Sequence, residues 1–85
     1  MGEQRWVVRS GTDFGRTIAD IRRRRDLTQA ELSARAGIGR SPLAKIEAGK
    51  TTLFVDHLLR LLRRLGATVT ITLDDNAAQD SDAPT

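Results

Sequence analysis

Start and stop signals for two short helices lie so close together within residues 27–50 that only a tight turn can connect them. Thr28 is a favourable N-cap residue, and Glu31 three positions later completes a capping box. Gly37 then predicts a left-handed C-cap that ends this helix after about two turns. Ile38 follows directly, and we expect its side chain to pack inward across the turn. The spacing therefore predicts a helix-turn-helix.

The second helix of the pair is expected over residues 40–48. Gly39 takes its N-cap position, where glycine caps less well than Ser or Thr by a few tenths of a kcal/mol. Pro42 falls within the first turn, where no intrahelical N–H bond is lost. Leu43 and Ile46 are three residues apart, so they share one face, which we expect to point into the core.

A supporting helix precedes the pair. Thr12 is a suitable N-cap for a helix over residues 13–25, and Asp13 suits the positive end of the helix dipole. Within this helix, apolar side chains recur at spacings of four and three, which places them on one face: Phe14, Ile18 and Ile21.

The C-terminal part predicts a fourth helix and a strand. Thr51 or Thr52 can cap a helix through Leu65 whose leucines cover more than one face, so part of its surface is expected to meet something beyond the monomer core. Apolar residues alternate with threonines over 68–73, which is typical of a strand. That strand needs a partner, either residues 4–9 of the same chain or the same strand of a second chain.

Charge is distributed unevenly along the 85 residues. The chain has 14 basic and 11 acidic residues and a net charge of +3. Four of the acids lie in the last 12 residues, where there is no Lys or Arg, so residues 1–73 carry a net charge of +7. A basic body of this size is typical of a polyanion binder, although ordinary solubility charge is the other interpretation. Residues 76–85 contain too few apolar side chains for a core and are expected to be disordered.

The composition argues against several other classes. The sequence has no Cys and one His, so we expect no disulfide, no cysteine-based or histidine-rich metal site and no bound cofactor. No segment has the ~20 apolar residues of a membrane span, and no apolar signal core begins the chain. We therefore expect a cytoplasmic, nucleoid-associated protein that is not an enzyme and does not contact a membrane.

The segment LTQAELSARAGIGRSPLAKIEAGK, residues 27–50, resembles the Cro/repressor-like (XRE) helix-turn-helix family almost throughout. Together with the leucine-rich helix, Leu65-Gly66 and the alternating strand, residues 10–73 look most like HipB-type antitoxins. The resemblance implies a mostly α, lambda-repressor-like bundle of four to five helices with a C-terminal dimerisation strand. Its expected parts are an N-terminal arm (1–11), a DNA-binding domain (12–66), the strand (67–75) and the acidic tail (76–85).

A recognition helix enters the major groove by its N-terminal half. With Leu43 and Ile46 inside, four residues remain on the groove side as expected base readers: Arg40, Ser41, Ala44 and Lys45. Arg40 fits the O6 and N7 atoms of guanine, a pairing worth roughly 1–3 kcal/mol, or it contacts phosphate only. Ser41 and Lys45 can each contact a base or the backbone.

Phosphate contacts are expected around this helix. The resemblance implies one at Gln29, whose alternative role is a local cap on its own helix. Lys50 and Thr51 resemble the family's second backbone clamp, although Lys50 could equally be a solvated surface lysine. Thr28 and Gly39, the two N-cap residues, complete the expected phosphate-binding set.

Glu47 needs a different role, because phosphate would repel an acid on the DNA side. The resemblance suggests a partner arginine in the first helix, where Arg22 holds the matching position. We therefore expect a structural Arg22–Glu47 ion pair.

Dimerisation is expected through the leucine-rich helix and the strand, at Leu59, Leu62, Val69, Ile71 and Leu73. The resemblance then implies a homodimer on a palindromic double-stranded DNA operator, with a HipA-like kinase toxin as partner. Two alternatives stay open. One is a phage- or host-type XRE repressor without a toxin, and the other is an interaction module that has lost DNA binding.

Overall fold

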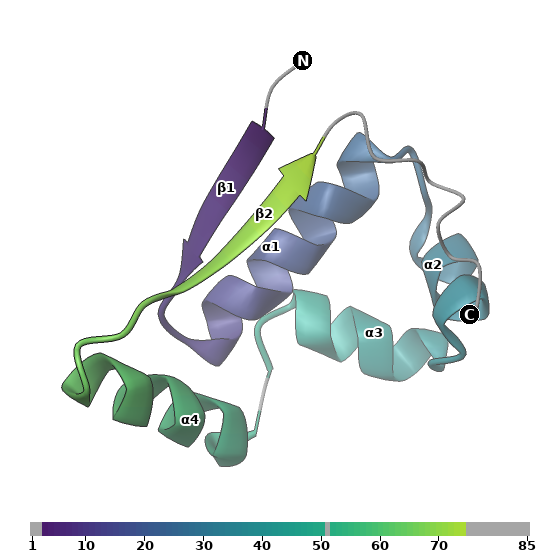
Figure 1. Cartoon of the computed structure of the whole chain (residues 1–85). Coiled ribbons are helices and arrows are strands. Elements are labelled where there is room, and N and C mark those ends of the chain that lie inside the picture. Colours follow the sequence, from purple (N-terminus) through teal and green to yellow (C-terminus); the bar gives the residue numbers. More distant parts are fainter. Residues whose placement is uncertain (1–2, 51, 75–85) are drawn as a thin grey trace.

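The computed structural model describes residues 3–50 and 52–74, which form a mostly helical bundle with one small sheet (Figure 1). The predicted fold class, a helix-turn-helix bundle with a C-terminal strand, is confirmed. The elements in chain order are β1 (Glu3–Val8), α1 (Gly11–Arg24), α2 (Gln29–Ala36), α3 (Arg40–Glu47), α4 (Leu53–Arg64) and β2 (Val69–Asp74). The predicted tail, residues 76–85, lies outside the described residues.

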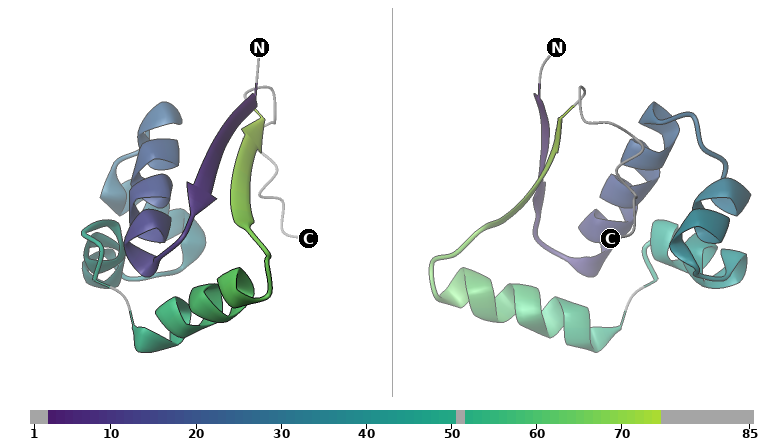
Figure 2. Two further views of the ribbon diagram at one scale, coloured as in Figure 1. Left: turned by 90° about the vertical axis from the view of Figure 1, so that its left-hand side faces the viewer. Right: turned by 45° about the vertical axis from the view of Figure 1, so that its right-hand side comes forward.

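Helix α1 is the centre of the arrangement. The two-stranded sheet lies along one side of it and the α2–α3 pair along the other, whereas α4 extends beneath, apart from α2 and α3 (Figures 1 and 2). The buried apolar core within the described residues is correspondingly small and consists of Val8, Ala19, Leu43 and Leu59. Each of α1, α3, α4 and β1 contributes one of these four residues.

The start of α1 differs from the prediction. Ser10, not Thr12, is the N-cap, and its hydroxyl accepts a hydrogen bond from the Asp13 backbone N–H at 3.2 Å. Ser10 has the extended backbone of a cap residue (φ −150°, ψ 169°), whereas Thr12 is already helical and donates to the Gly49 carbonyl at 3.5 Å. Gly11 is the first residue of the helix although glycine is a poor helix former, which makes a cap upstream of it hard to predict.

The N-terminal arm and the C-terminal strand pair within one chain. β1 and β2 are antiparallel, with Trp6 opposite Ile71 and Val8 opposite Val69. This is the first of the two expected pairings, and it leaves one edge of each strand without a strand neighbour among the described residues. Trp6 reaches Asp20 of α1 through its indole N–H at 3.3 Å, so this face of the sheet is the one that packs on α1.

Helices α1 and α3 approach closely at Gly15. A Cβ atom at this position would overlap the Ile46 carbonyl oxygen, so only glycine allows the two backbones this near. The turn before α3 corrects one prediction. Ile38 lies in the turn directly after the left-handed Gly37 C-cap, is 44% exposed and does not pack inward, whereas Leu43, at 4% exposure, lies in the core.

Replacing Gly15 by Ala is expected to lower the free energy of unfolding by about 1–3 kcal/mol, the range for overpacking. The clash with the Ile46 carbonyl oxygen outweighs the better helix propensity of alanine, which is about 1 kcal/mol. Urea denaturation followed by circular dichroism measures the change. Arg16→Ala, at the exposed neighbouring position, is the control and should stay within about 0.5 kcal/mol of the parent. Equal or higher stability of Gly15→Ala would contradict the close contact.

Candidate DNA-binding surface

The turn between α2 and α3 begins from a fully formed cap. The Thr28 hydroxyl accepts from the Glu31 backbone N–H at 3.0 Å, and the Glu31 carboxylate accepts from the Thr28 N–H at 2.8 Å. The backbone hydrogen bond from Thr28 lowers the pKa of Glu31. Gly37 ends α2 in the left-handed region at φ 71°. The predicted capping box and glycine C-cap are both confirmed.

Helix α3 presents one face to solvent and one to the core. Gly39 is its N-cap without a side-chain hydrogen bond. Leu43 is buried, and Ile46 is half-buried on the same side. Of the four predicted base readers, Arg40, Ser41 and Lys45 are exposed and Ala44 is half-buried. Their sequence spacing places them together on the outward side of α3.

The Arg22–Glu47 ion pair is present and is bidentate. Arg22 Nε donates to Glu47 Oε2 at 2.7 Å, and Arg22 Nη2 donates to Glu47 Oε1 at 2.9 Å. The third guanidinium nitrogen, Nη1, donates to the Leu27 carbonyl oxygen at 2.8 Å. The two side chains are only 12% and 5% exposed. One arginine therefore connects α1, the α1–α2 turn and the C-terminal end of α3.

Gln29 joins this cluster. Its Nε2 atom donates to Glu47 Oε1 at 3.0 Å, which ties the first residue of α2 to the last residue of α3. The sequence predicts a phosphate contact or a local cap for Gln29, and this link between helices is not among those expectations. An amide nitrogen has two hydrogens, so the contact with Glu47 leaves one for another acceptor.

The cluster also shifts protonation equilibria. The hydrogen bonds from Arg22 hold the pKa of Glu47 below its ordinary value, since they favour the ionised carboxylate, and Gln29 adds to the effect. Hydrogen bonding to Glu47 likewise raises the pKa of Arg22. Burial opposes both shifts but is the smaller cause in each case.

The remaining predicted phosphate contacts lie around these helices. The Thr28 backbone N–H already serves Glu31, so only its hydroxyl hydrogen remains to be donated. Gly39 starts α3, where the first turn has N–H groups without intrahelical partners. Lys50 is exposed just after α3. Thr51 lies outside the described residues.

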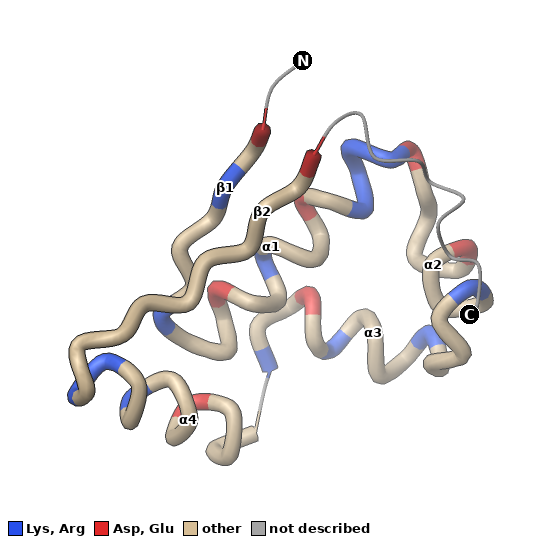
Figure 3. Tube along the Cα trace, in the orientation of Figure 1, with Lys and Arg blue, Asp and Glu red and all other residues tan. Residues whose placement is uncertain are grey.

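Basic residues lie along α3, in the last turn of α1 and in the second half of α4 (Figure 3). Two arginines at the end of α1 contact the sheet. Arg24 lies over the Trp6 ring at 5.5 Å from its centroid, and Arg25 Nη2 donates to the Asp74 carbonyl oxygen at 3.2 Å. Arg23 pairs with Asp20 at 3.6 Å. Arg24 and Arg25 therefore help to hold α1 against β1 and β2, whereas the Arg23 pair stays within α1.

Two other structural observations bear on the site. Within residues 3–50 and 52–74, no group of three or more His, Cys, Asp or Glu side chains could hold a metal ion. None of the helices in this part of the chain has the length and apolar character needed to cross a bilayer.

Comparison with known proteins identifies the family. Residues 13–71 match the model of the helix-turn-helix domain, so the chain belongs to the helix-turn-helix family. It is also 31% identical over 64 residues to y4mF of Sinorhizobium fredii, named as an uncharacterized HTH-type transcriptional regulator. That alignment covers 75% of this chain and 84% of the relative. No solved structure matches the chain significantly.

Glu47→Gln is expected to lower the free energy of unfolding at pH 7 by about 1.5–3 kcal/mol, because it weakens hydrogen bonds to a charged group. The difference should shrink with acid. A carboxylate with a lowered folded-state pKa contributes its stability above the ordinary value of 4.5 and loses it as the pH falls through the folded-state pKa. Urea titrations between pH 7 and pH 3 measure both effects.

Glu3→Gln is the matched control, because Glu3 pairs with Arg5 only at the surface, where side-chain exposures are 49% and 67%. Its effect should be below about 1 kcal/mol at every pH. A loss for Glu47→Gln that stays constant down to pH 3 would show that the ionised form of Glu47 does not supply the stability.

Proposed function

We propose that this protein is a sequence-specific DNA-binding transcriptional repressor whose α3 enters the major groove. One observation carries the proposal. The inner side of α3 is fixed by buried Leu43 and by the ion pair of Glu47, while Arg40, Ser41 and Lys45 on the opposite side are exposed to solvent. A rigid helix with free polar side chains on its outer face suits base reading. The helix-turn-helix family and the regulator name of y4mF support this function.

The proposed contacts divide into two kinds. Arg40, Ser41 and Lys45 read base edges, and Ala44, which is half-buried, contacts a thymine methyl. Gln29, Lys50 and Thr51, with the helix starts at Thr28 and Gly39, hold phosphates. The second hydrogen on Gln29 Nε2 supports its part, because the first is held by Glu47 in a fixed direction. Such contacts make binding depend on salt.

A homodimer on a palindromic operator completes the proposal, with half-sites about 34–36 Å apart or a multiple of it. Of the residues first expected in the dimer interface, Leu59 is 4% exposed and already part of its own chain's core. Val69, Ile71 and Leu73 are half-buried on the sheet face that packs on α1. Leu62, at 36% exposure, and the edge of β2 that has no strand neighbour among the described residues remain available for a second copy.

As a finer proposal, the chain is the antitoxin of a HipBA-like module that binds a kinase-like toxin and represses its own operon. Support comes from the resemblance of residues 10–73 to HipB-type antitoxins and from the strand β2, which follows the leucine-rich α4 as in that group. A phage- or host-type repressor would use the same DNA contacts without the toxin.

Arg40→Ala is expected to weaken binding to the specific operator roughly 5- to 150-fold, the equivalent of the 1–3 kcal/mol lost with one bidentate guanine contact. Non-specific binding should change little. Operators selected from a randomised duplex pool, then titrated by fluorescence anisotropy at fixed salt, provide the measurement. Arg5→Ala, an exposed arginine on β1, is the control and should bind both kinds of DNA as the parent does. Unchanged specific affinity for Arg40→Ala would refute the base contact.

The antitoxin proposal is tested by the neighbouring gene and its product. A kinase-like protein encoded beside this chain should co-purify with it, and the complex should bind the operator upstream of both genes. If no kinase-like gene lies there, or if its product and this chain elute separately, the chain is a repressor without a toxin.

A further inference from the structure

Helix α4 has an apolar stripe that the described part of the chain leaves uncovered. Phe54, Leu58 and Leu61 of α4 and Leu65 at its C-cap, here called the α4 stripe, are 68%, 44%, 61% and 79% exposed. Their spacing of four, three and four residues keeps them within an arc of about 60° on the helix surface. Sustained exposure of large apolar side chains along one line marks an interaction surface rather than scattered surface residues.

The attachment of α4 to the body explains why the stripe faces outward. Leu59 is buried on the other side of the helix. The Asp56 carboxylate accepts from the Gly11 backbone N–H at 2.8 Å, and Arg63 donates to the Arg9 carbonyl oxygen at 2.6 Å. These contacts fix the rotation of α4 about its axis.

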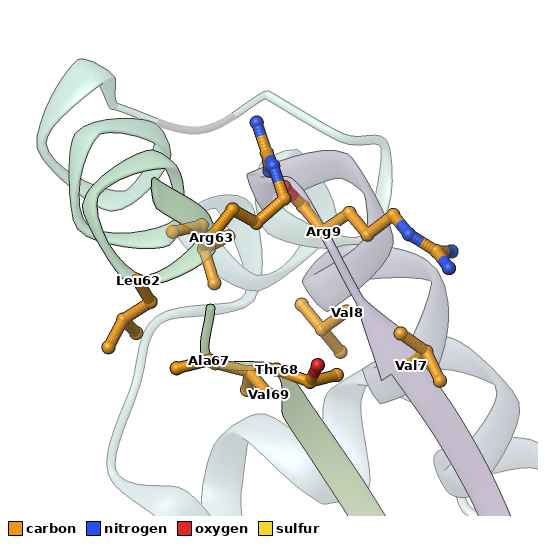
Figure 4. A pocket seen from close by; sticks show the side chains of 9 residues that line it. Val7, Val8, Arg9, Leu62, Arg63, Ala67, Thr68 and Val69 are labelled. Atoms are coloured by element: carbon orange, nitrogen blue, oxygen red, sulfur yellow. The ribbon is translucent and has the colours of Figure 1, made fainter. Parts of the chain in front are cut away.

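The stripe continues toward the sheet. A crevice of about 70 Å³ separates α4 from the base of β1 and β2, and Leu62 and Val7 are among the residues that line it (Figure 4). Leu62 is 36% exposed and Val7 is 44% exposed. The apolar surface therefore extends beyond the helix onto the first strand.

The occupant best suited to this stripe is a second copy of the same chain. A spacing of four, three and four reads the same in both directions, so two stripes related by a two-fold axis match when the helices run antiparallel. Phe54 then faces Leu65 of the other copy, and Leu58 faces Leu61. The charged residues Arg60 and Arg63 lie off the stripe, so no like charges meet at its centre.

The available area agrees with a dimer contact. Each exposed side chain of the stripe offers on the order of 100 Å² of apolar surface, so two copies offer on the order of 800 Å² from the stripe alone. This is about half of a standard interface of roughly 1,600 Å². Leu62 and Val7 border the stripe and are 36% and 44% exposed.

We propose that the α4 stripe is the self-association surface of this protein, with two α4 helices packed antiparallel across a two-fold axis. The inference deepens the proposed dimeric repressor and assigns its interface to residues other than those expected from the sequence. Because α4 lies apart from α2 and α3 (Figure 2), a dimer through the stripe leaves both helices of the reading motif uncovered.

Leu61→Lys tests the interface, because two lysines would be buried beside the Leu58 side chains. Sedimentation of the full chain at about 50 µM should give a dimer for the parent and a monomer for Leu61→Lys. The dissociation constant of the Leu61→Lys dimer should be at least 100-fold higher than that of the parent. Leu53→Lys is the matched control. Leu53 is similarly exposed, at 69%, on the same helix but outside the stripe, and its variant should remain dimeric. Unchanged circular dichroism verifies that both variants fold.

A covalent test addresses the direction of packing, since the chain has no native cysteine. Equimolar Phe54→Cys and Leu65→Cys chains, mixed and oxidised, should give the 54–65 heterodisulfide in excess over either homodisulfide. Predominant 54–54 and 65–65 disulfides would refute antiparallel packing. A monomeric parent, or a Leu61→Lys variant that stays dimeric, would overturn the interface itself.

These outcomes are separable from the DNA proposal. Leu61→Lys should lose binding to a palindromic site but keep weak binding to a single half-site, since Arg40 and Lys45 are untouched. Absence of specific DNA binding by the dimeric parent would refute the repressor function while leaving the self-association result intact.

Discussion

Three helices of this protein meet at one carboxylate. Glu47 receives both arms of Arg22 from α1 and the amide of Gln29 from α2, and it belongs itself to the end of α3. In a chain with only four buried apolar core residues among those described, hydrophobic packing alone fixes the helix angles weakly. The geometry of a bidentate ion pair is directional, so it sets the orientation of α3 where leucine packing would tolerate rotation. The close approach of α1 and α3 at Gly15 supplies the matching steric constraint.

The same junction orders the surface proposed to meet DNA. Because Glu47 is neutralised on the inner side, the outer side of α3 carries only basic and neutral groups. Gln29 has one amide hydrogen on Glu47, so its side chain is held in place before any phosphate arrives. Preorganisation of this kind lowers the entropy lost on binding. Glu47, an acid next to the surface proposed to meet DNA, thus helps to hold that surface in place.

Local signals in the sequence predicted the local structure well. The capping box at Thr28, the glycine at 37 and the alternation in β2 each fix backbone geometry through neighbouring residues, and each is present. What the sequence left open depends on distant residues. Whether β2 pairs with β1 or with a second chain, and whether Ile38 packs inward as expected, depends on how α1 positions its neighbours. The hydrogen bond from Gln29 to Glu47 could likewise not be predicted from the spacing of residues, because its two partners are 18 residues apart in the sequence.

The arrangement separates two tasks along the chain. Residues of α2 and α3 are tied to the second half of α1 through Arg22, whereas α4 is tied to the start of α1 through Gly11 and Arg9. β2 returns to the far end of α1, where Arg25 holds its last carbonyl. α1 thus sets the distance between the proposed DNA-reading surface and the proposed self-association surface. With α1 rigid and both attachments directional, pairing two α4 helices would fix the separation of two α3 helices, and half-site spacing on DNA becomes a consequence of the monomer fold.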